Sequence, residues 1–195
     1  MRIVGGRFRG RALAVPKDAR VRPTSDKVRQ AVFNILAHRD FGGFALDGAK
    51  AIDLFAGTGA MGLEAISRGA SYCLFVEDSA DSRALIRANV EALSLTGVTK
   101  IWRRDATALG TMSAGAGGPF DIAFLDPPYR QGLIAPALAS LRAGGWLVPG
   151  ALAVAETADG EDIPYTDGFE VLDSRGHGET KIAVMRCTVT SPPRR

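Results

Sequence analysis

The sequence predicts an α/β domain built on a mostly parallel sheet of seven strands, with an antiparallel strand near the C-terminus and helices on both faces. Two observations support this prediction. From residue 50 onward, short apolar runs alternate with segments of helical periodicity, and the runs are apolar at consecutive positions, as in strands buried on both sides. Towards the end, two strand-like runs follow each other directly, which is typical of an antiparallel pair at a sheet edge.

The composition is that of one globular domain in the cytoplasm. Of the 195 residues, 46% are hydrophobic and 23% charged, so the chain can bury a sizeable core. The apolar runs are strand-sized, too short to span a membrane, and the first residues carry arginines without a signal-peptide apolar region. Cys73 and Cys187 lack CxxC spacing and clustered histidines, so we expect neither a disulfide framework nor a metal site.

The chain begins with a segment that predicts a hairpin-like arm. Two apolar segments, 3–4 and 12–15, flank the glycine- and arginine-rich stretch 5–11. We therefore divide the chain into an arm, residues 1–22, and a main domain with its leading helix, residues 23–195.

The elements of the main domain follow in order. The leading helix begins after Thr24 or Ser25, either of which can cap it, and its apolar residues recur at helical spacing at Val28, Val32, Ile35 and Leu36. Strands are then predicted at 51–55, 72–76, 100–103, 122–125 and 152–155. Helices are predicted at 61–67, 79–93 and 133–141. The antiparallel pair is 169–172 and 181–186, joined by a loop at 173–180, and a mobile loop is expected at 110–118.

Positive charge is concentrated at the N-terminal end. Residues 1–29 contain nine arginines and lysines against two aspartates, a charge of +7, whereas the whole chain carries +3, which leaves −4 for the rest. This asymmetry favours an arm that contacts a polyanion over a merely solubilising surface. The candidate nucleic-acid contacts are Arg7, Arg9, Arg11, Arg20, Arg22 and Lys27.

A strand, a glycine loop and a helix follow one another at 53–62. Gly57, Gly59 and Gly62 satisfy the GxGxxG pattern, and Glu77 lies twenty positions after Gly57, where an acid can accept both hydroxyls of a ribose. The pattern alone does not separate a nicotinamide cofactor from other adenosine-containing ones. Asp53 decides against a pyrophosphate, because a carboxylate just ahead of the loop suits a cofactor that carries an ammonium and a sulfonium instead.

Two further acids end strands. Asp105 follows the third strand and suits an adenine amine, and residues 126–129, the sequence DPPY, follow the fourth. The two prolines restrict the backbone, so the carboxylate of Asp126 is held stiffly at a strand end. An exocyclic amine of a nucleobase is a poor nucleophile, and a carboxylate and a carbonyl that accept its N–H groups would favour attack while Tyr129 stacks on the base. The alternative to a functional role is that DPPY forms an ordinary turn with a buried aromatic ring.

The motifs together resemble a known family. The order DLFAGTGAMGLEA, FVE, RRDA and DPPY is similar to Rossmann-like class I methyltransferases that use S-adenosylmethionine. The segments 3–11, 22–29 and 33–36 further resemble the RsmD family of bacterial 16S rRNA guanine-N2 methyltransferases, and the similarity covers nearly the whole chain, including the terminal segment 176–180. DPPY alone is shared with DNA adenine methyltransferases, so the N-terminal segments are the more specific part.

The resemblance implies methyl transfer from S-adenosylmethionine to the exocyclic N2 of one guanine in 16S rRNA, guanine 966 in the usual naming. The product would be S-adenosylhomocysteine, and the substrate an assembling 30S particle, with the enzyme a monomer that needs neither metal nor membrane. The implied catalytic residues are Asp126, Pro127, Pro128 and Tyr129. The implied cofactor-binding residues are Asp53, Phe55, Gly57, Thr58, Gly59, Glu77, Asp78, Asp105, Ala106 and Asp126.

Some alternatives stay open. Either acid of the pair Glu77 and Asp78 can bind the ribose, and Glu77 is favoured because it directly ends its strand. The same amine clamp serves adenine N6 of DNA or of another RNA. A nicotinamide-dependent dehydrogenase rests on GxGxxG alone, and a catalytically silent RNA-binding module is disfavoured because Asp53, Glu77 and Asp126 are all present.

Overall fold

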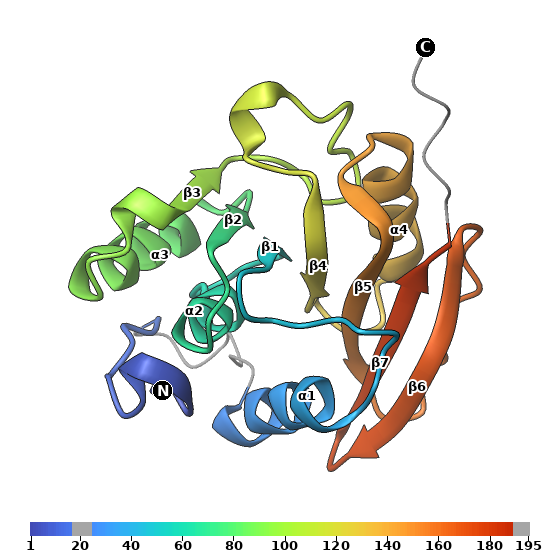
Figure 1. Ribbon diagram of the computed structural model, residues 1–195, viewed down its shortest axis with the longest axis horizontal. Coiled ribbons are helices and arrows are strands. Elements are labelled where there is room, and N and C mark those ends of the chain that lie inside the picture. Colours follow the sequence, from blue (N-terminus) through green and yellow to red (C-terminus); the bar gives the residue numbers. More distant parts are fainter. Residues whose placement is uncertain (17–24, 189–195) are drawn as a thin grey trace.

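One seven-stranded sheet organises the chain, with the strand order β3-β2-β1-β4-β5-β7-β6 (Figure 1). The structure is a computed structural model that describes residues 1–16 and 25–188. The strands are β1 (Lys50–Leu54), β2 (Tyr72–Val76), β3 (Thr99–Trp102), β4 (Phe120–Leu125), β5 (Leu147–Ala158), β6 (Phe169–His177) and β7 (Thr180–Cys187). Neighbouring strands are parallel except at β7, which is antiparallel to both β5 and β6. The predicted mostly parallel sheet with one antiparallel strand is confirmed.

The order of strands changes direction at β1. From β1 the chain adds β2 and β3 on one side, and then crosses back to add β4 on the other side. The two connections that leave β1 and β4 therefore diverge, and in open α/β sheets ligands bind at such a point, beyond the carboxyl ends of the strands.

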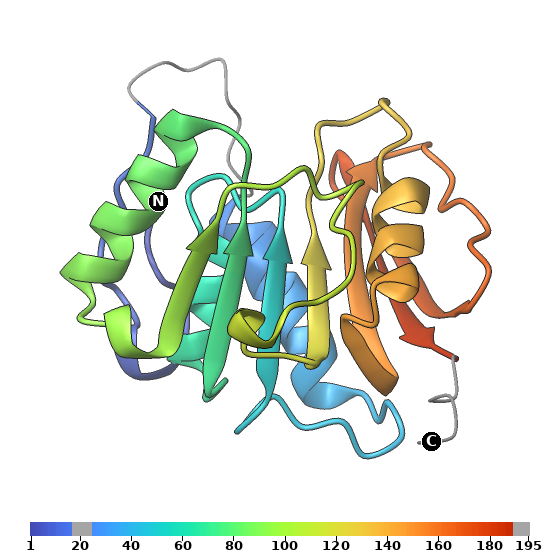
Figure 2. The same ribbon diagram turned by 90° about the horizontal axis from the view of Figure 1, so that it is seen from above.

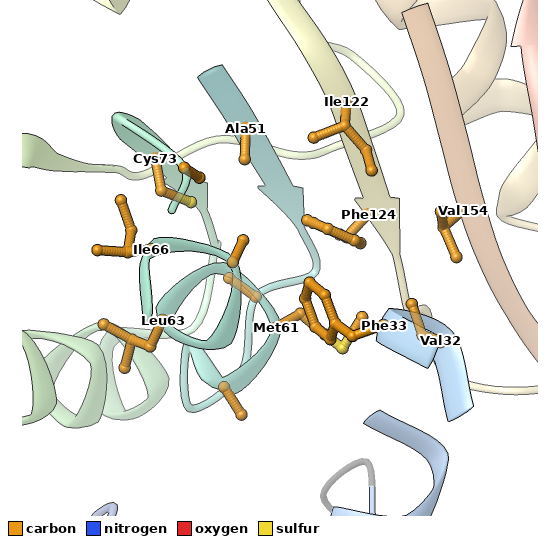
Figure 3. Packing of buried hydrophobic residues seen from close by; sticks show 14 of the residues in the cluster. Val32, Phe33, Ala51, Met61, Leu63, Ile66, Cys73, Ile122, Phe124 and Val154 are labelled. Carbon is orange, nitrogen blue, oxygen red and sulfur yellow. The ribbon is translucent and has the colours of Figure 1, made fainter. Parts of the chain in front are cut away.

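Helices cover the two faces unequally. The helices are α1 (Asp26–His38), α2 (Ala60–Ser67), α3 (Ala80–Ala92) and α4 (Ile134–Ala143). One buried cluster joins α1, α2 and α3 to one face, where Phe33 of α1 packs on Phe124 of β4 with ring centroids 5.6 Å apart (Figure 3). The other cluster joins α4 and the segment 103–119 to the opposite face (Figure 2). In the described ranges 1–16 and 25–188, no helix is long and apolar enough to cross a membrane.

Serine caps fix two helix starts at the predicted places. The Ser25 hydroxyl accepts the Val28 N–H at 3.2 Å at the start of α1, and the Ser79 hydroxyl accepts the Ser82 N–H at 3.3 Å at the start of α3. Each cap satisfies an N–H group that the first turn of a helix leaves without an intrahelical partner. Thr24, the other candidate cap, lies outside the described residues, as does the predicted boundary between residues 22 and 23.

Three predictions of local structure are wrong. The fifth strand is much longer than 152–155, because β5 spans Leu147–Ala158. The loop predicted at 173–180 is largely strand, because β7 pairs with β6 as far as His177 and leaves only a tight turn. The segment 110–118, expected to be mobile, packs over the sheet: Ala116 is fully buried, and the Gly110 carbonyl accepts the indole N–H of Trp146 at 2.8 Å.

The N-terminal segment is docked rather than projecting. Arg2 and Ala12 form a single antiparallel bridge around a 3₁₀ turn at Gly6–Phe8, so the predicted β-hairpin is not confirmed as a pair of strands. Ile3 is fully buried, and the hydroxyl of Ser67, at the end of α2, accepts the Phe8 N–H at 3.0 Å. The apolar residues on either side of the arginines therefore anchor the segment beside α2 and α3 (Figure 1).

Candidate active site at the carboxyl ends of the strands

The glycine loop after β1 is held in left-handed backbone geometry. Phe55, Gly57 and Gly59 have φ of 56°, 55° and 77°, a region that glycine enters at no steric cost and other residues rarely adopt. Phe55 therefore lies in a sparsely populated conformation at the start of the loop, and such residues cluster at functional sites. The Gly59 N–H donates to the Ala56 carbonyl at 2.7 Å, which closes the turn directly before α2.

Gly62 fits the third glycine of the motif for a packing reason. A Cβ at this position would lie 2.4 Å from Cys73 Sγ and 2.5 Å from Phe75 Cε1, both on β2. Only glycine lets α2 lie this close to the sheet. The Gly62 N–H donates to Asp53 Oδ2 at 2.9 Å, so the same residue also connects the helix to the acid of β1.

Three predicted acids converge at this edge. Asp53 is buried, and burial raises its pKa well above the usual value; the Gly62 N–H opposes this, while the neighbouring carboxylates of Asp126 and Glu77 raise the pKa further. These acids come from the ends of β1, β4 and β2. Their shared negative potential suits a cationic ligand and disfavours a pyrophosphate.

Glu77 is the member of the acid pair that faces the glycine loop. Its Oε2 accepts the Gly57 N–H and its Oε1 accepts the Ser79 N–H, each at 2.8 Å. A carboxylate has about four acceptor positions, so two such bonds leave capacity for hydroxyl groups. Asp78 is exposed, and its backbone carbonyl, like that of Glu77, accepts the guanidinium of Arg83.

Asp105 lies at the rim, in a turn after β3. Its Oδ1 accepts both the N–H and the hydroxyl of Thr107, at 2.8 and 2.7 Å, and these bonds lower the pKa of its carboxyl group. The next residue, Ala106, is buried against the second core cluster. Asp105 and Ala106 thus present one polar and one apolar side chain after β3. They lie near Glu77, whose backbone N–H donates to the Trp102 carbonyl of β3.

The DPPY segment follows β4 at the same edge. Asp126 is partly buried, Pro127 is buried and Pro128 is exposed. The ring of Tyr129 is partly buried, and its hydroxyl donates to Glu156 Oε1 of β5 at 2.5 Å. Beyond this ring lies a surface hollow of about 480 Å³, lined by Tyr129, Arg130, Ala158, Asp159, Gly178 and Glu179. The segment therefore has a carboxylate near Asp53 and an aromatic ring at the surface hollow.

The described basic residues predicted for nucleic acid lie on the docked arm and at the start of α1. Arg7, Arg9 and Arg11 of the docked arm are exposed, and so is Lys27 in the first turn of α1. Two of the arginines also make contacts within the protein: the Arg7 guanidinium lies 4.7 Å from the Phe8 ring centroid, and Arg11 donates to the Ala92 carbonyl. Arg20 and Arg22 lie outside the described residues.

Sequence reasoning did not single out two buried polar residues, Asn89 and Glu156. Asn89, on α3, is 2% exposed and donates to the Thr58 carbonyl of the glycine loop. Glu156 ends the apolar run 151–155. A polar residue that interrupts a buried apolar face is the signal that would have drawn attention to both.

Within the described ranges, no group of three or more histidine, cysteine, aspartate or glutamate side chains is arranged to hold a metal ion. The two cysteines are buried and not bonded to each other. The carboxylates of Asp53 and Glu77 lie beside the glycine loop, where they favour a ligand with a positive charge and hydroxyl groups.

Comparison with known proteins identifies the family. The family model described as "Conserved hypothetical protein 95" matches residues 1–186. The chain is 38% identical over 165 residues to "Ribosomal RNA small subunit methyltransferase D" of Escherichia coli, covering 84% of this chain and 78% of the relative.

Solved structures share the fold. The structure of "Putative methyltransferase yhhF from Escherichia coli" matches with a TM-score of 0.80 and 30% identity, over 96% of this chain and 98% of that one. An RNA methyltransferase from Salinibacter ruber, solved in complex with S-adenosyl-L-homocysteine, shares the fold alone, with a TM-score of 0.60, 14% identity, and coverage of 89% and 98%. The sheet is therefore that of the class I methyltransferases, and the chain belongs to the RsmD family.

Proposed function

We propose that this protein transfers a methyl group from S-adenosylmethionine to the exocyclic N2 of a specific guanine in 16S rRNA, of the guanine 966 type. The name of the relative from Escherichia coli supports an rRNA methyltransferase. The observation that carries the proposal is the convergence of Asp53, Glu77 and Asp126 between the glycine loop and the DPPY segment. The enzyme would act in the cytoplasm, as a monomer, on an assembling 30S particle.

The cofactor would lie along the carboxyl ends of β1, β2 and β3. The backbone of Phe55, Gly57, Thr58 and Gly59 would allow its close approach, Asp53 would attract its cationic end, and Glu77 would accept the ribose hydroxyls. Asp105 and Ala106 would flank the adenine, one with a carboxylate and the other with an apolar surface. When bound, S-adenosylmethionine supplies a methyl group made electrophilic by the sulfonium. Asp78 would stay at the rim.

The DPPY segment would hold the nucleophile. The Asp126 carboxylate and the carbonyl region of Pro127 would accept the two N–H groups of the guanine amine, which directs its lone pair towards the methyl group. Because the leaving group is already activated, placement contributes more than a strong base, and orientation alone can supply several kcal/mol. Pro128 keeps the segment stiff, and Tyr129 would stack on a base that has been turned out of its helix.

The arm would bring the RNA to this edge. Exposed Arg7, Arg9, Arg11 and Lys27 can neutralise phosphates, which positions the RNA without reading its sequence. Arg20 and Arg22 are assigned the same role from the sequence alone. The cluster of Asp53, Glu77 and Asp126 would itself repel the RNA backbone, so we expect phosphate contacts around this cluster and a single base beside it.

The decisive experiment maps N2-methylguanine in 16S rRNA from cells that lack this protein. We expect loss of the modification at one position, restored by the wild-type gene and not by an Asp126→Ala variant. An unchanged modification pattern would contradict the proposed function.

A second experiment distinguishes rRNA from DNA as the substrate. Purified protein is given labelled S-adenosylmethionine with deproteinised 16S rRNA, with 30S particles or with duplex DNA. Label in rRNA or particles supports the proposal, whereas label only in DNA, as N6-methyladenine, would replace it with the alternative that DPPY also allows.

A further inference from the structure

Glu156 is an acid in a place where burial is costly. It lies on β5, in the run Ala151–Ala158 that is buried throughout, and it is 7% exposed. A buried carboxylate is destabilising unless it accepts hydrogen bonds. The Tyr129 hydroxyl provides one such bond, at 2.5 Å.

The pairing of the strands holds the backbone of Glu156 in place. The β4 and β5 pairing ends at Leu125 and Ala155, so Asp126 and Glu156 each follow the last paired position of neighbouring strands. On its other side, Glu156 is paired with Ile182 of β7. The carboxylate is thus carried by a strand with a neighbour on each side, whereas Tyr129 lies in a connection at the edge.

The Tyr129 ring needs a contact that fixes its orientation. The prolines restrict the backbone of the DPPY segment, but they do not set the side-chain torsions of Tyr129. A partly exposed ring exchanges between rotamers in picoseconds to nanoseconds unless packing or a hydrogen bond holds it. A bond at the hydroxyl, the far end of the ring, removes the freedom that the backbone leaves. It also fixes the ring as the wall of the neighbouring hollow.

We infer that Glu156 is a positioning residue for methyl transfer: it fixes the plane of the Tyr129 ring on which the target guanine stacks. This inference rests on the proposed function and assigns the orientation of the base to a residue outside the DPPY segment. Glu156 itself does not touch the base. Its contribution lies in the geometry of attack, where small displacements are expensive.

The test compares variants that remove either end of the bond. Tyr129→Phe keeps the ring and removes its hydroxyl, Glu156→Ala removes the acceptor, and Glu156→Gln keeps a carbonyl acceptor of the same shape. Tyr72→Phe is the matched control, because the Tyr72 hydroxyl donates to the Ala116 carbonyl at 3.1 Å near the opposite end of the strands.

Methylation of 16S rRNA gives the first readout. We expect Glu156→Ala and Tyr129→Phe each to lower kcat by about tenfold or more, with cofactor affinity changed less than about twofold. The double variant should be no slower than either single one, Glu156→Gln should recover most of the rate, and Tyr72→Phe should match the wild type. Additive losses, or a Glu156→Ala variant with wild-type kcat and only a lower Tm, would overturn the inference.

The order of the ring, measured by NMR on protein labelled in its three tyrosines, does not depend on activity. Tyr72, with its bonded hydroxyl, gives the anchored reference, and Tyr165, which is 89% exposed, gives the mobile one. Tyr129 should be as ordered as Tyr72 in the wild type and should approach Tyr165 in Glu156→Ala. A ring equally ordered in both proteins overturns the inference. A wild-type protein that leaves 16S rRNA unmethylated overturns the proposed function instead, whatever the ring does.

Discussion

Asn89 of α3 donates its side-chain N–H to the carbonyl oxygen of Thr58 at 3.0 Å and so ties the third helix to the glycine loop. The same amide pairs with Ala14 of the arm, accepting its N–H at 2.6 Å and donating to its carbonyl at 3.2 Å. One buried side chain therefore joins three parts of the chain that are far apart in sequence. Asn89 therefore stabilises both the arm and the proposed cofactor loop.

Replacing Asn89 with alanine should weaken both parts at once. The change leaves the Thr58 carbonyl and the backbone of Ala14 without this partner, and a buried polar group that loses its bond costs about 1–3 kcal/mol. We expect a Tm lower by several degrees and weaker S-adenosylmethionine binding, measured by thermal unfolding and calorimetry. Asn34→Ala on the exposed face of α1 is the control and should change neither. An Asn89→Ala protein with wild-type values would show that the amide is dispensable.

Cofactor binding should release a proton from Asp53. Burial raises the pKa of this carboxyl in the ligand-free protein, so part of the population is protonated at pH values where an exposed aspartate would be ionised. A cation bound beside it favours the ionised form and lowers its pKa, so the affinity should rise with pH through the raised pKa and then level off. Calorimetry in buffers of different ionisation enthalpy measures the proton. Asp53→Asn should abolish the release; an equal release in that variant would assign it elsewhere.

The raised pKa of Asp53 should make the folded protein less stable as pH rises, whereas cofactor binding becomes stronger as pH rises. Because the pKa of Asp53 is higher in the folded than in the unfolded chain, its contribution to stability is fully present below the unfolded value, and is lost as pH rises through the folded value. Asp53→Asn should therefore lose less stability than the wild type over that pH range. Denaturant unfolding at several pH values measures the difference, and parallel curves for the two proteins would contradict it.

Loss of the Asp126 carboxylate should stop methyl transfer without preventing cofactor binding. Removing a group that holds the reacting atoms typically lowers kcat by a factor of about 10²–10³. We expect Asp126→Ala to lower kcat by this factor or more. Asp121→Ala is the matched control: this aspartate lies near the start of the same strand, where its Oδ2 accepts the Lys50 N–H. Single-turnover methylation and calorimetry separate the two effects. An Asp126→Ala enzyme with ordinary turnover would remove this residue from the mechanism.

Gly62→Ala tests why the motif needs its third glycine. The added methyl would overlap Cys73 and Phe75 in the packed core, and overpacking of this kind costs about 1–3 kcal/mol despite the better helix propensity of alanine. For a chain of this length, each kcal/mol lowers Tm by about 2–4 °C. Gly97→Ala, at a position with nothing within 4 Å of the new Cβ, should leave Tm unchanged. Equal Tm values for the two variants would contradict close packing at α2.

The arm arginines should determine how RNA binding depends on salt. Arg7→Gln and Arg9→Gln each remove an exposed charge, so each should lower the slope of log K against log salt by about 0.7–1 without changing the preferred RNA sequence. Arg142→Gln, on α4, removes a surface arginine paired with Asp167 and should leave the slope unaltered. Identical slopes for all three variants would place the RNA contacts elsewhere.

Local chemistry made much of the fold predictable. Ser25 and Ser79 signal helix starts, and the apolar run around Asp53 signals a buried strand; these elements lie close to the predicted positions. The spacing of Gly57 and Glu77 indicates that two strand ends meet, and these two residues share a hydrogen bond. These signals are local, or arise from the fixed geometry of a strand, loop and helix, so a single sequence carries them.

What escaped prediction depends on partners distant in sequence. Residues 173–177 are polar and read as loop, yet β7 supplies the hydrogen bonds that make them strand. The short apolar segments that contain Ile3 and Leu13 indicate a hairpin-like arm, but the surface that buries these two residues is made by other elements. Likewise, nothing in the sequence states that Tyr129 and Glu156, 27 residues apart, share a hydrogen bond.

The burial of both cysteines has a practical consequence for spectroscopy. Burial, together with the nearby Asp53, raises the pKa of the Cys73 thiol well above its usual value, so little of the reactive thiolate forms at neutral pH, and Cys187 is shielded in the core. A cysteine introduced at an exposed point such as Arg9 would then take up a maleimide dye selectively, with both native thiols left in place. Fluorescence from that dye would report the arrival of RNA at the arm in real time.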